Sequence, residues 1–327
     1  MLMKSIMRLM LVLALLLAAV APLAAQEKPA ANGSSKEVCV TFDDLPLNGP
    51  DIDLKRLRAM TVKLLSVIRA HKVPAVAFVN ERKLYRLGEM DERVAILKLW
   101  LDAGIELGNH TYSHASLQTT PLAAFEEDVV RGETVTRMLL ERRGMKLRYF
   151  RHPFLRTGPT LEARAAFEKF LAERGYTVAP VTFDDADYMF NMVYVKARER
   201  HDAALMRRTG EAYLEHMRTM VDFFEKLALE VVGSPIRHTL LLHANELNAD
   251  YFDGVARMLE GRGYAFVTLA RALEDKAYRL PDNYAGPWGV SWLHRWAYSR
   301  GMKQTLKAEP DPPEFIQKLY NEATASR

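Results

Sequence analysis

Short apolar runs alternate with longer amphipathic segments along most of this chain. The run 37–42 has the length of a buried strand, whereas the segment 53–71 repeats apolar residues three and four positions apart, as one face of a helix requires. The same alternation continues to residue 278. The expected strands are 37–42, 74–79, 105–107, 146–150, 176–183, 239–242 and 264–267, and the expected helices are 53–71, 91–103, 121–143, 160–174, 207–230, 251–259 and 269–278.

Seven strand–helix units in succession favour a parallel sheet covered by helices. With that many units, a closed or nearly closed barrel is more natural than a doubly wound sheet. We therefore predict an α/β fold, a deformed (β/α)7-type barrel. In such a barrel the carboxyl ends of all strands meet on one face, which is where active sites are found.

Four segments fall outside this alternation. Residues 1–25 have a basic start, an apolar stretch too short for a comfortable membrane span and small residues before Gln26, which is typical of a cleaved signal peptide. An uncleaved anchor is the weaker alternative. Residues 26–36 are expected to be a flexible linker and 189–206 a polar insertion. The extension 279–327 carries three tryptophans that could line a sugar groove, although packing on the barrel is the simpler expectation.

Composition removes several classes of function. The chain has 327 residues, of which 49% are hydrophobic and 26% charged, as in ordinary globular proteins. Loss of Lys4 and Arg8 with the signal peptide would reduce the net charge from +4 to +2, and no block of Lys and Arg stands out, so no nucleic-acid partner is expected. The single cysteine, Cys39, cannot form an internal disulfide and is expected to be a small buried residue.

Titratable side chains collect at the ends of the expected strands. His110 and His114 would project from one face if their segment turned helically, but a histidine pair alone is a weak signal. One carboxylate of Asp43 and Asp44 could complete a three-ligand zinc set with an open fourth position. The other could act as a general base. His243 follows a later strand and is expected on the same face.

The sequence Val-Thr-Phe-Asp-Asp occurs twice, at 40–44 and at 181–185. Both copies are expected to reach the same face of the barrel. We assign the metal site to the first copy, which is followed by Leu45 and Pro46.

Five short motifs occur in the order found in polysaccharide deacetylases, the NodB-homology carbohydrate esterases of the family 4 type. They are Thr-Phe-Asp-Asp at 41–44, His-Thr-Tyr-Ser-His at 110–114, Arg-His-Pro-Phe at 151–154, Asp-Asp-Ala-Asp-Tyr at 184–188 and Leu-Leu-His at 241–243. The chain resembles this family over residues 37–278. The resemblance implies a deformed NodB-type barrel that removes N-acetyl groups from a sugar polymer or oligomer.

The resemblance also implies a metal centre with a base beside it. By position, Asp44, His110 and His114 would bind one divalent metal ion, with zinc expected. Asp43 would be the catalytic base that acts on metal-activated water. Arg151 would hold Asp43 ionised and oriented, because a nearby guanidinium favours the carboxylate.

The remaining motifs imply an acid and a substrate pocket. His243 would protonate the departing amine, and Asp187 would keep it cationic. The backbone N–H of Phe154 would help to hold the oxyanion, while Leu242 and Tyr188 would flank the acetyl group. Phe154 stands where the family commonly has tyrosine, and Tyr188 where it has tryptophan, so these positions leave substrate specificity open.

We therefore predict an exported, periplasmic or secreted, metal-dependent deacetylase. Its substrate would be an N-acetylated glycan such as peptidoglycan, a chitin-type oligosaccharide or an exopolysaccharide. No stable membrane span is expected after signal cleavage, and the oligomeric state stays open. One alternative is a hydrolase of a small amide, a ureide or imide, on the same scaffold. The other is a glycan-binding module without turnover.

Overall fold

The computed structural model describes residues 36–302 and 305–325. The predicted signal peptide and all of the predicted linker except Lys36 lie outside the described residues. The strands are β1 (Lys36–Leu45), β2 (Val76–Val79), β3 (Glu106–Asn109), β4 (Tyr149–Phe150), β5 (Thr177–Val178), β6 (His238–His243) and β7 (Tyr264–Phe266).

Helices follow most of these strands. They are α2 (Leu54–Ala70), α3 (Met90–Asp102), α4 (Leu122–Arg131), α5 (Thr134–Glu141), α6 (Leu161–Glu173), α7 (Asp187–Glu199), α8 (Ala203–Val232), α9 (Glu246–Gly261), α10 (Leu269–Leu273), α11 (Trp292–Ser299) and α12 (Glu314–Ala325). Short 3₁₀ helices occur at Glu81–Leu84, Pro153–Leu155, Lys276–Arg279 and Thr305–Ala308.

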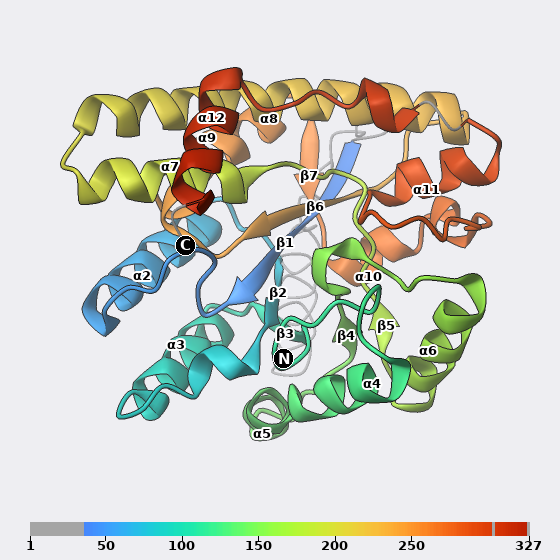
Figure 1. Ribbon diagram of the computed structural model, residues 1–327, viewed down its shortest axis with the longest axis horizontal. Coiled ribbons are helices and arrows are strands. Elements are labelled where there is room, and N and C mark those ends of the chain that lie inside the picture. The colour runs from blue at the N-terminus through green and yellow to red at the C-terminus, as the bar shows by residue number, and fades with distance from the viewer. Residues whose placement is uncertain (1–35, 303–304, 326–327) are drawn as a thin grey trace, which may run out of the picture. The chain divides into compact units, whose positions relative to one another are not determined.

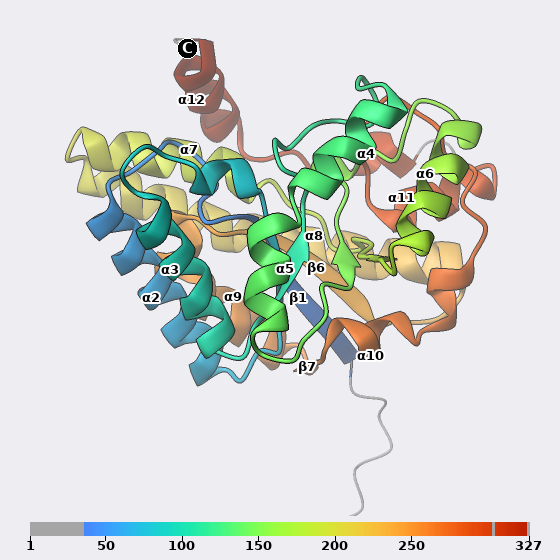
Figure 2. The same cartoon turned by 90° about the horizontal axis from the view of Figure 1, so that it is seen from below.

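The seven strands form one parallel sheet in the order β5-β4-β3-β2-β1-β6, and β7 pairs with the first residues of β1. A single bridge from Phe183 to Leu240 links the chain after β5 to β6 at the other edge. Helices α2 and α3 lie to the left of the strands, and α6 and α11 to the right, around the curved sheet (Figures 1 and 2). This incompletely closed parallel sheet confirms the predicted deformed (β/α) barrel.

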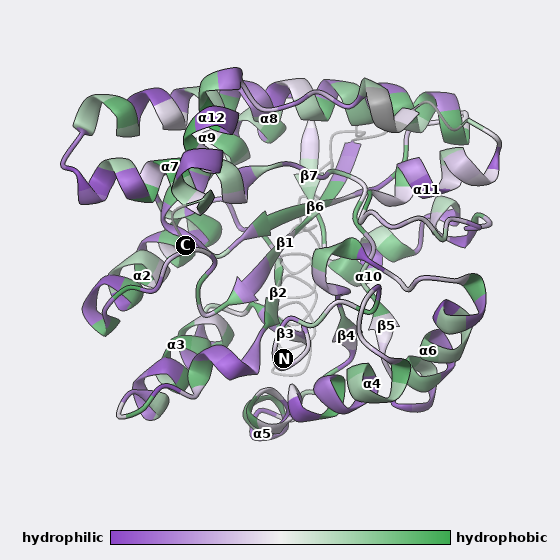
Figure 3. Ribbon diagram, in the orientation of Figure 1, coloured by the Kyte–Doolittle hydropathy of each residue, from purple (hydrophilic) through white to green (hydrophobic). Residues whose placement is uncertain are grey.

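The core forms where the apolar side of the sheet meets the helices. Phe42 of β1 is fully buried, with ring centroids 5.6 Å from Trp100 and 5.4 Å from Phe252. Strand β6 is hydrophobic along most of its length, whereas α2 and α3 carry both hydrophobic and hydrophilic residues (Figure 3). Cys39 is a buried free thiol, as its place in an apolar run predicts.

The single helix predicted at 121–143 is wrong, because the chain breaks at Gly132 into α4 and α5. A Cβ atom on Gly132 would lie 2.7 Å from the carbonyl carbon of Thr111. The histidine-bearing loop therefore passes directly against this glycine, and a continuous helix with a side chain there would exclude it. Helical periodicity alone cannot reveal such a contact.

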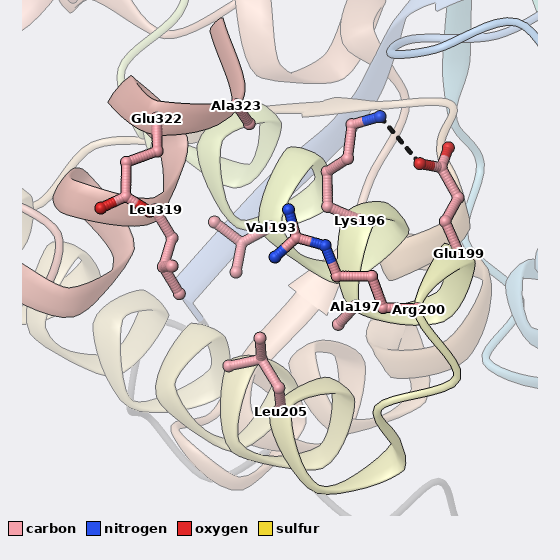
Figure 4. Close-up of a pocket in the computed structure, with 9 residues that line it drawn as sticks. All are labelled: Val193, Lys196, Ala197, Glu199, Arg200, Leu205, Leu319, Glu322 and Ala323. Atoms are coloured by element: carbon pink, nitrogen blue, oxygen red, sulfur yellow. Dashed lines mark hydrogen bonds and ion pairs between the residues drawn. The ribbon is translucent and has the colours of Figure 1, made fainter. Parts of the chain in front are cut away.

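The segment 189–206, expected as a polar insertion, forms most of α7 and the start of α8. Its apolar residues, among them Phe190, Val193 and Val195, are buried. Helix α7 packs against α8, α9 and α12. A hollow of about 370 Å³ remains between α7, the start of α8 and α12, with Val193, Leu205 and Leu319 on its wall (Figure 4).

Among residues 36–302 and 305–325, we find no helix with the length and apolar character needed to cross a bilayer.

We predict that Phe42→Ala lowers the free energy of unfolding by about 3–5 kcal/mol, because it leaves a cavity between two large aromatic rings. Urea unfolding followed by circular dichroism measures this loss. Leu87→Ala is the matched control, since Leu87 is fully exposed and its loss should change stability by less than about 0.5 kcal/mol. Equal midpoints for the two variants would contradict the central place of Phe42 in the core.

Candidate active site

One cavity of about 710 Å³ opens at the carboxyl ends of the strands. Its wall brings together residues from five separate stretches of sequence that the motifs had singled out. They are Asp43, Asp44, His110, His114, Phe154, Asp184, Asp185, Tyr188 and His243. The predicted site residues Arg151 and Asp187 are fully buried immediately behind this wall.

Strand β1 supplies two consecutive carboxylates to the same cavity, although neighbouring residues of a regular strand point to opposite faces. The pairing of β1 with β2 shifts register between Phe42 and Leu45, as in a β-bulge. Asp44 sits in this irregularity with a left-handed φ of 70°. The local distortion is what lets both Asp43 and Asp44 face the cavity.

Asp44, His110 and His114 form a group that could hold a metal ion, with one ligand atom from each lying within 4.8 Å of the others. The Asp44 Oδ1 atom is 3.9 Å from His110 Nε2 and 3.6 Å from His114 Nε2. Ligands bound at about 2.0–2.2 Å to a single zinc ion lie roughly 3–4 Å apart, so this spacing fits a shared cation. Asp44 Oδ1 is buried and accepts no hydrogen bond from any described residue.

The protonation of the histidines also suits a metal. His110 Nδ1 donates to the carbonyl oxygen of Arg151 at 2.9 Å, which leaves Nε2 as a lone-pair donor facing Asp44. Burial holds the pKa of His110 well below its usual range. Burial likewise lowers the pKa of His114. Both imidazoles are therefore neutral at pH 7, the form that binds metals.

Asp44 is ionised despite its burial. Desolvation would raise the pKa of its carboxyl, but the surrounding positive charges, that of Lys83 foremost, together outweigh this effect and hold the pKa well below the usual range. Lys83 Nζ lies 3.3 Å from Asp44 Oδ1, and Asn48 donates to Oδ2 at 2.7 Å. The Asn48 contact fixes Oδ2, whereas Oδ1 faces both the Lys83 ammonium and the two histidines.

The two histidines meet through a loop and not through a helical turn. Thr111 and His114 both have left-handed φ values, 64° and 61°. Asp128 of α4 holds the loop by accepting hydrogen bonds from the backbone N–H groups of Tyr112 and Ser113. The rings of His110 and His114 end with centroids 4.9 Å apart.

On the opposite side of the cavity, Asp187 and His243 form a tight pair. His243 Nδ1 donates to Asp187 Oδ1 at 2.6 Å, and Asn245 and Asn248 donate to Oδ2. Burial alone would lower the pKa of His243, but the charge and hydrogen bond of Asp187 raise it to about 10. His243 is therefore an imidazolium at pH 7.

Arg151 acts on Asp43 through its charge. Its guanidinium donates to Thr41 Oγ1 at 2.7 Å, while its Nε and Nη1 atoms have no partner among the described residues. Burial raises the pKa of Asp43 to about 6, and the charge of Arg151 limits that rise. Asp43 is thus mostly ionised at pH 7 and can still accept a proton, as a general base must.

Phe154 and Tyr188 lie on the cavity wall, as predicted for substrate contacts. The ring of Phe154 is 4.3 Å from that of His114, and the ring of Tyr188 is 6.2 Å from that of His243. Leu242, predicted to flank the acetyl group, does not line the cavity. Its side chain packs into the main core with Phe42. Strand residues alternate in direction, so Leu241 faces the cavity in its place.

The second Val-Thr-Phe-Asp-Asp copy also reaches the cavity, through Asp184 and Asp185. Strand β5 ends at Val178, so this copy is mostly irregular chain, with only the Phe183 bridge to β6. Among the described residues, the metal-binding group contains Asp44 and not Asp185. The geometry thus favours the first copy.

The family model for polysaccharide deacetylase matches residues 30–170. This segment is thus similar to the polysaccharide deacetylase family. It contains Asp43, Asp44, His110, His114 and Arg151. The pair of Asp187 and His243 lies beyond its end.

A peptidoglycan-N-acetylglucosamine deacetylase of Bacillus cereus is 28% identical over 153 residues. The match covers 46% of this chain and 46% of that relative, so the chain spans about half the length of the curated protein. Among solved structures, a family 4 carbohydrate esterase from Streptomyces lividans is 18% identical with a TM-score of 0.45, covering 74% of this chain and 97% of the other. A family 4 pseudoenzyme from Bacillus anthracis is 16% identical with a TM-score of 0.45, covering 73% and 66%.

Part of the cavity wall comes from outside the family segment and was not predicted from the motifs. Helix α8 contributes His216 and Met220, and the C-terminal extension contributes Trp288, Glu309 and Tyr320, with others. The sequence offered one signal, the cluster of aromatic residues after 280. Trp296 packs in the core as expected, whereas Trp288 is 65% exposed.

We predict that Asp44→Asn weakens the binding of added Zn²⁺ to this candidate metal site at least about tenfold, because it removes the anionic ligand. Isothermal titration of metal-stripped protein with Zn²⁺ measures the affinity. Asp185→Asn is the matched control, since it removes a carboxylate of the same cavity outside the metal group, and it should bind zinc as the parent does. Loss of binding in Asp185→Asn alone would reverse the assignment.

Proposed function

We propose that this protein hydrolyses N-acetyl amide groups on a glycan and releases acetate. The observation that carries the proposal is the placement of a metal-binding group, an ionised carboxylate and an imidazolium around one cavity. Asp44, His110 and His114 would hold one divalent ion, with zinc as our first choice. Asp43 and His243 would be the base and the acid.

An amide is a poor electrophile with a poor leaving group, so its hydrolysis needs a strengthened nucleophile, a sink for negative charge and a proton for nitrogen. A divalent cation, when bound, supplies Lewis-acid polarisation and makes water more acidic. Asp43 takes the proton from the attacking water. His243 Nε2 gives its proton to the amide nitrogen as the carbon–nitrogen bond breaks, so that acetate and an amine leave.

Several side chains would fix the reacting groups in place. Asp187 holds the His243 ring by one nitrogen and keeps the other, protonated nitrogen toward the cavity. The Phe154 N–H would stabilise the oxyanion, since backbone donors at such sites are preorganised. Phe154 and Leu155 both have left-handed φ values, 57° and 54°, so the main chain turns sharply at this point.

A glycan substrate is supported by the family of residues 30–170 and by the relative named for peptidoglycan N-acetylglucosamine. Such a substrate lies outside the cytoplasm, in agreement with the signal peptide expected at residues 1–25. We therefore propose an exported protein that acts on a cell-wall or chitin-type glycan.

Acetate release from peptidoglycan, chito-oligosaccharides and exopolysaccharide tests this function directly. We expect turnover that a chelator abolishes and added Zn²⁺ restores, and a loss of about 10²-fold or more in His243→Ala. If no glycan released acetate while small ureides or imides were hydrolysed, the small-amide alternative would be favoured. Glycan binding without acetate release, unchanged by chelator, would favour the binding module.

We predict that Asp187→Asn moves the basic limb of the pH–rate profile to lower pH. A general acid works while protonated, so activity falls as pH rises through the pKa of His243, about 10 in the parent. Without the charge of Asp187, burial acts on the imidazole with less opposition and its pKa drops. The profile of kcat/KM against pH measures this, and an unmoved basic limb would remove His243 from the acid role.

A further inference from the structure

The C-terminal extension builds one wall of the catalytic cavity. Trp288, Gly289, Glu309, Asp311 and Tyr320 all line it. Helix α12 is held in place by its packing on α7, and the ring of Tyr320 lies 5.8 Å from that of Tyr188. Packing of α12 thus holds the Tyr320 end of this wall, and the whole wall lies beyond the segment that matches the family.

Trp288 is the exposed tryptophan of this wall. The chain has four tryptophans, of which Trp100 and Trp296 are buried in the core and Trp292 is half-buried, while 65% of Trp288 is exposed. A large apolar ring left open at a cavity is costly in water, and it suits a ligand with an apolar face.

The main chain around Trp288 is tightly anchored, so the exposure of its ring is a built feature. A Cβ atom on Gly289 would lie 1.5 Å from the carbonyl oxygen of Phe154, which means that the two backbones touch. Tyr284 donates to the carbonyl oxygen of Trp288 at 3.2 Å. The ring of Phe154 lies 4.3 Å from that of His114, so the main chain that carries Trp288 contacts a residue beside the candidate metal site.

The same cavity also offers acceptors for hydroxyl groups. Asp184, Asp185, Glu309 and Asp311 line it together. Only 9% of Asp185 is exposed, and its Oδ2 atom has no hydrogen-bond partner among the described residues. A pyranose ring presents an apolar C–H face and a rim of hydroxyl donors, and the cavity supplies the complement of both.

We propose that Trp288 is a stacking platform for the sugar unit next to the one that loses its acetyl group. The protein would then select oligomers of at least two N-acetylated units over monosaccharides. This proposal rests on the proposed glycan specificity and deepens it, since it assigns a neighbouring sugar subsite to a residue of the C-terminal extension.

The experiment compares N-acetylglucosamine with its tetramer on the zinc-loaded protein. In the parent, kcat/KM should be higher for the tetramer, and Trp288→Ala should lower the ratio of tetramer to monomer by about three- to tenfold. Trp288→Phe keeps an aromatic face and should restore most of the ratio. Leu87→Ala, an exposed apolar residue outside the cavity wall, should leave both rates unchanged.

A second readout separates this proposal from the catalytic one. Tetramer added to the chelator-treated parent should change its tryptophan fluorescence, and Trp288→Phe, which keeps the other three tryptophans, should lose that change. A fluorescence change in the parent without acetate release would support the subsite and contradict the proposed activity. A ratio unmoved in Trp288→Ala, or a fluorescence change that survives in Trp288→Phe, would overturn the subsite.

Discussion

The site depends first on how β1 pairs with β6. In this parallel pairing, Asp43 is the register partner of His243, and the N–H of Ala244 donates to the carbonyl oxygen of Asp43. A slip of one residue would turn the side chains of one strand to the other face. The register is secured by the alternating apolar residues of both strands, among them Phe42 and Leu242, which are fully buried on one side. The packing of the core thus fixes the separation of the proposed base and acid.

Burial has opposite consequences on the two sides of the cavity. His110 and His114 lose their charge because desolvation is not offset, and this prepares them as neutral ligands. His243 is equally removed from water, yet it keeps its charge because Asp187 sits 2.6 Å away and is itself held by two asparagines. One chemical type of side chain is thereby neutral on one side of the cavity and cationic on the other, as the proposed ligand and acid roles require, and the tight Asp187 pair makes the difference.

Much of this arrangement could be predicted from the sequence. The alternation of strands and helices predicts a parallel sheet, and residues at the carboxyl ends of its strands lie on one face. That logic places Asp43, His110 and His243 on one face. It fails where a contact between distant segments decides the backbone. Gly132 breaks a helix to admit the histidine loop, and the bulge at Asp44 turns a second carboxylate inward. Periodicity carries no information about either contact.

The backbone contact between Gly289 and Phe154 also limits how the sequence of the C-terminal extension can change. Because the extension rests directly on the backbone of a residue at the catalytic rim, it cannot be exchanged as an independent module. A replacement segment must present a residue without a side chain at that point, or it will push on the turn that carries Phe154. Changes in the extension are therefore mechanically coupled to the turn at Phe154 on the cavity wall.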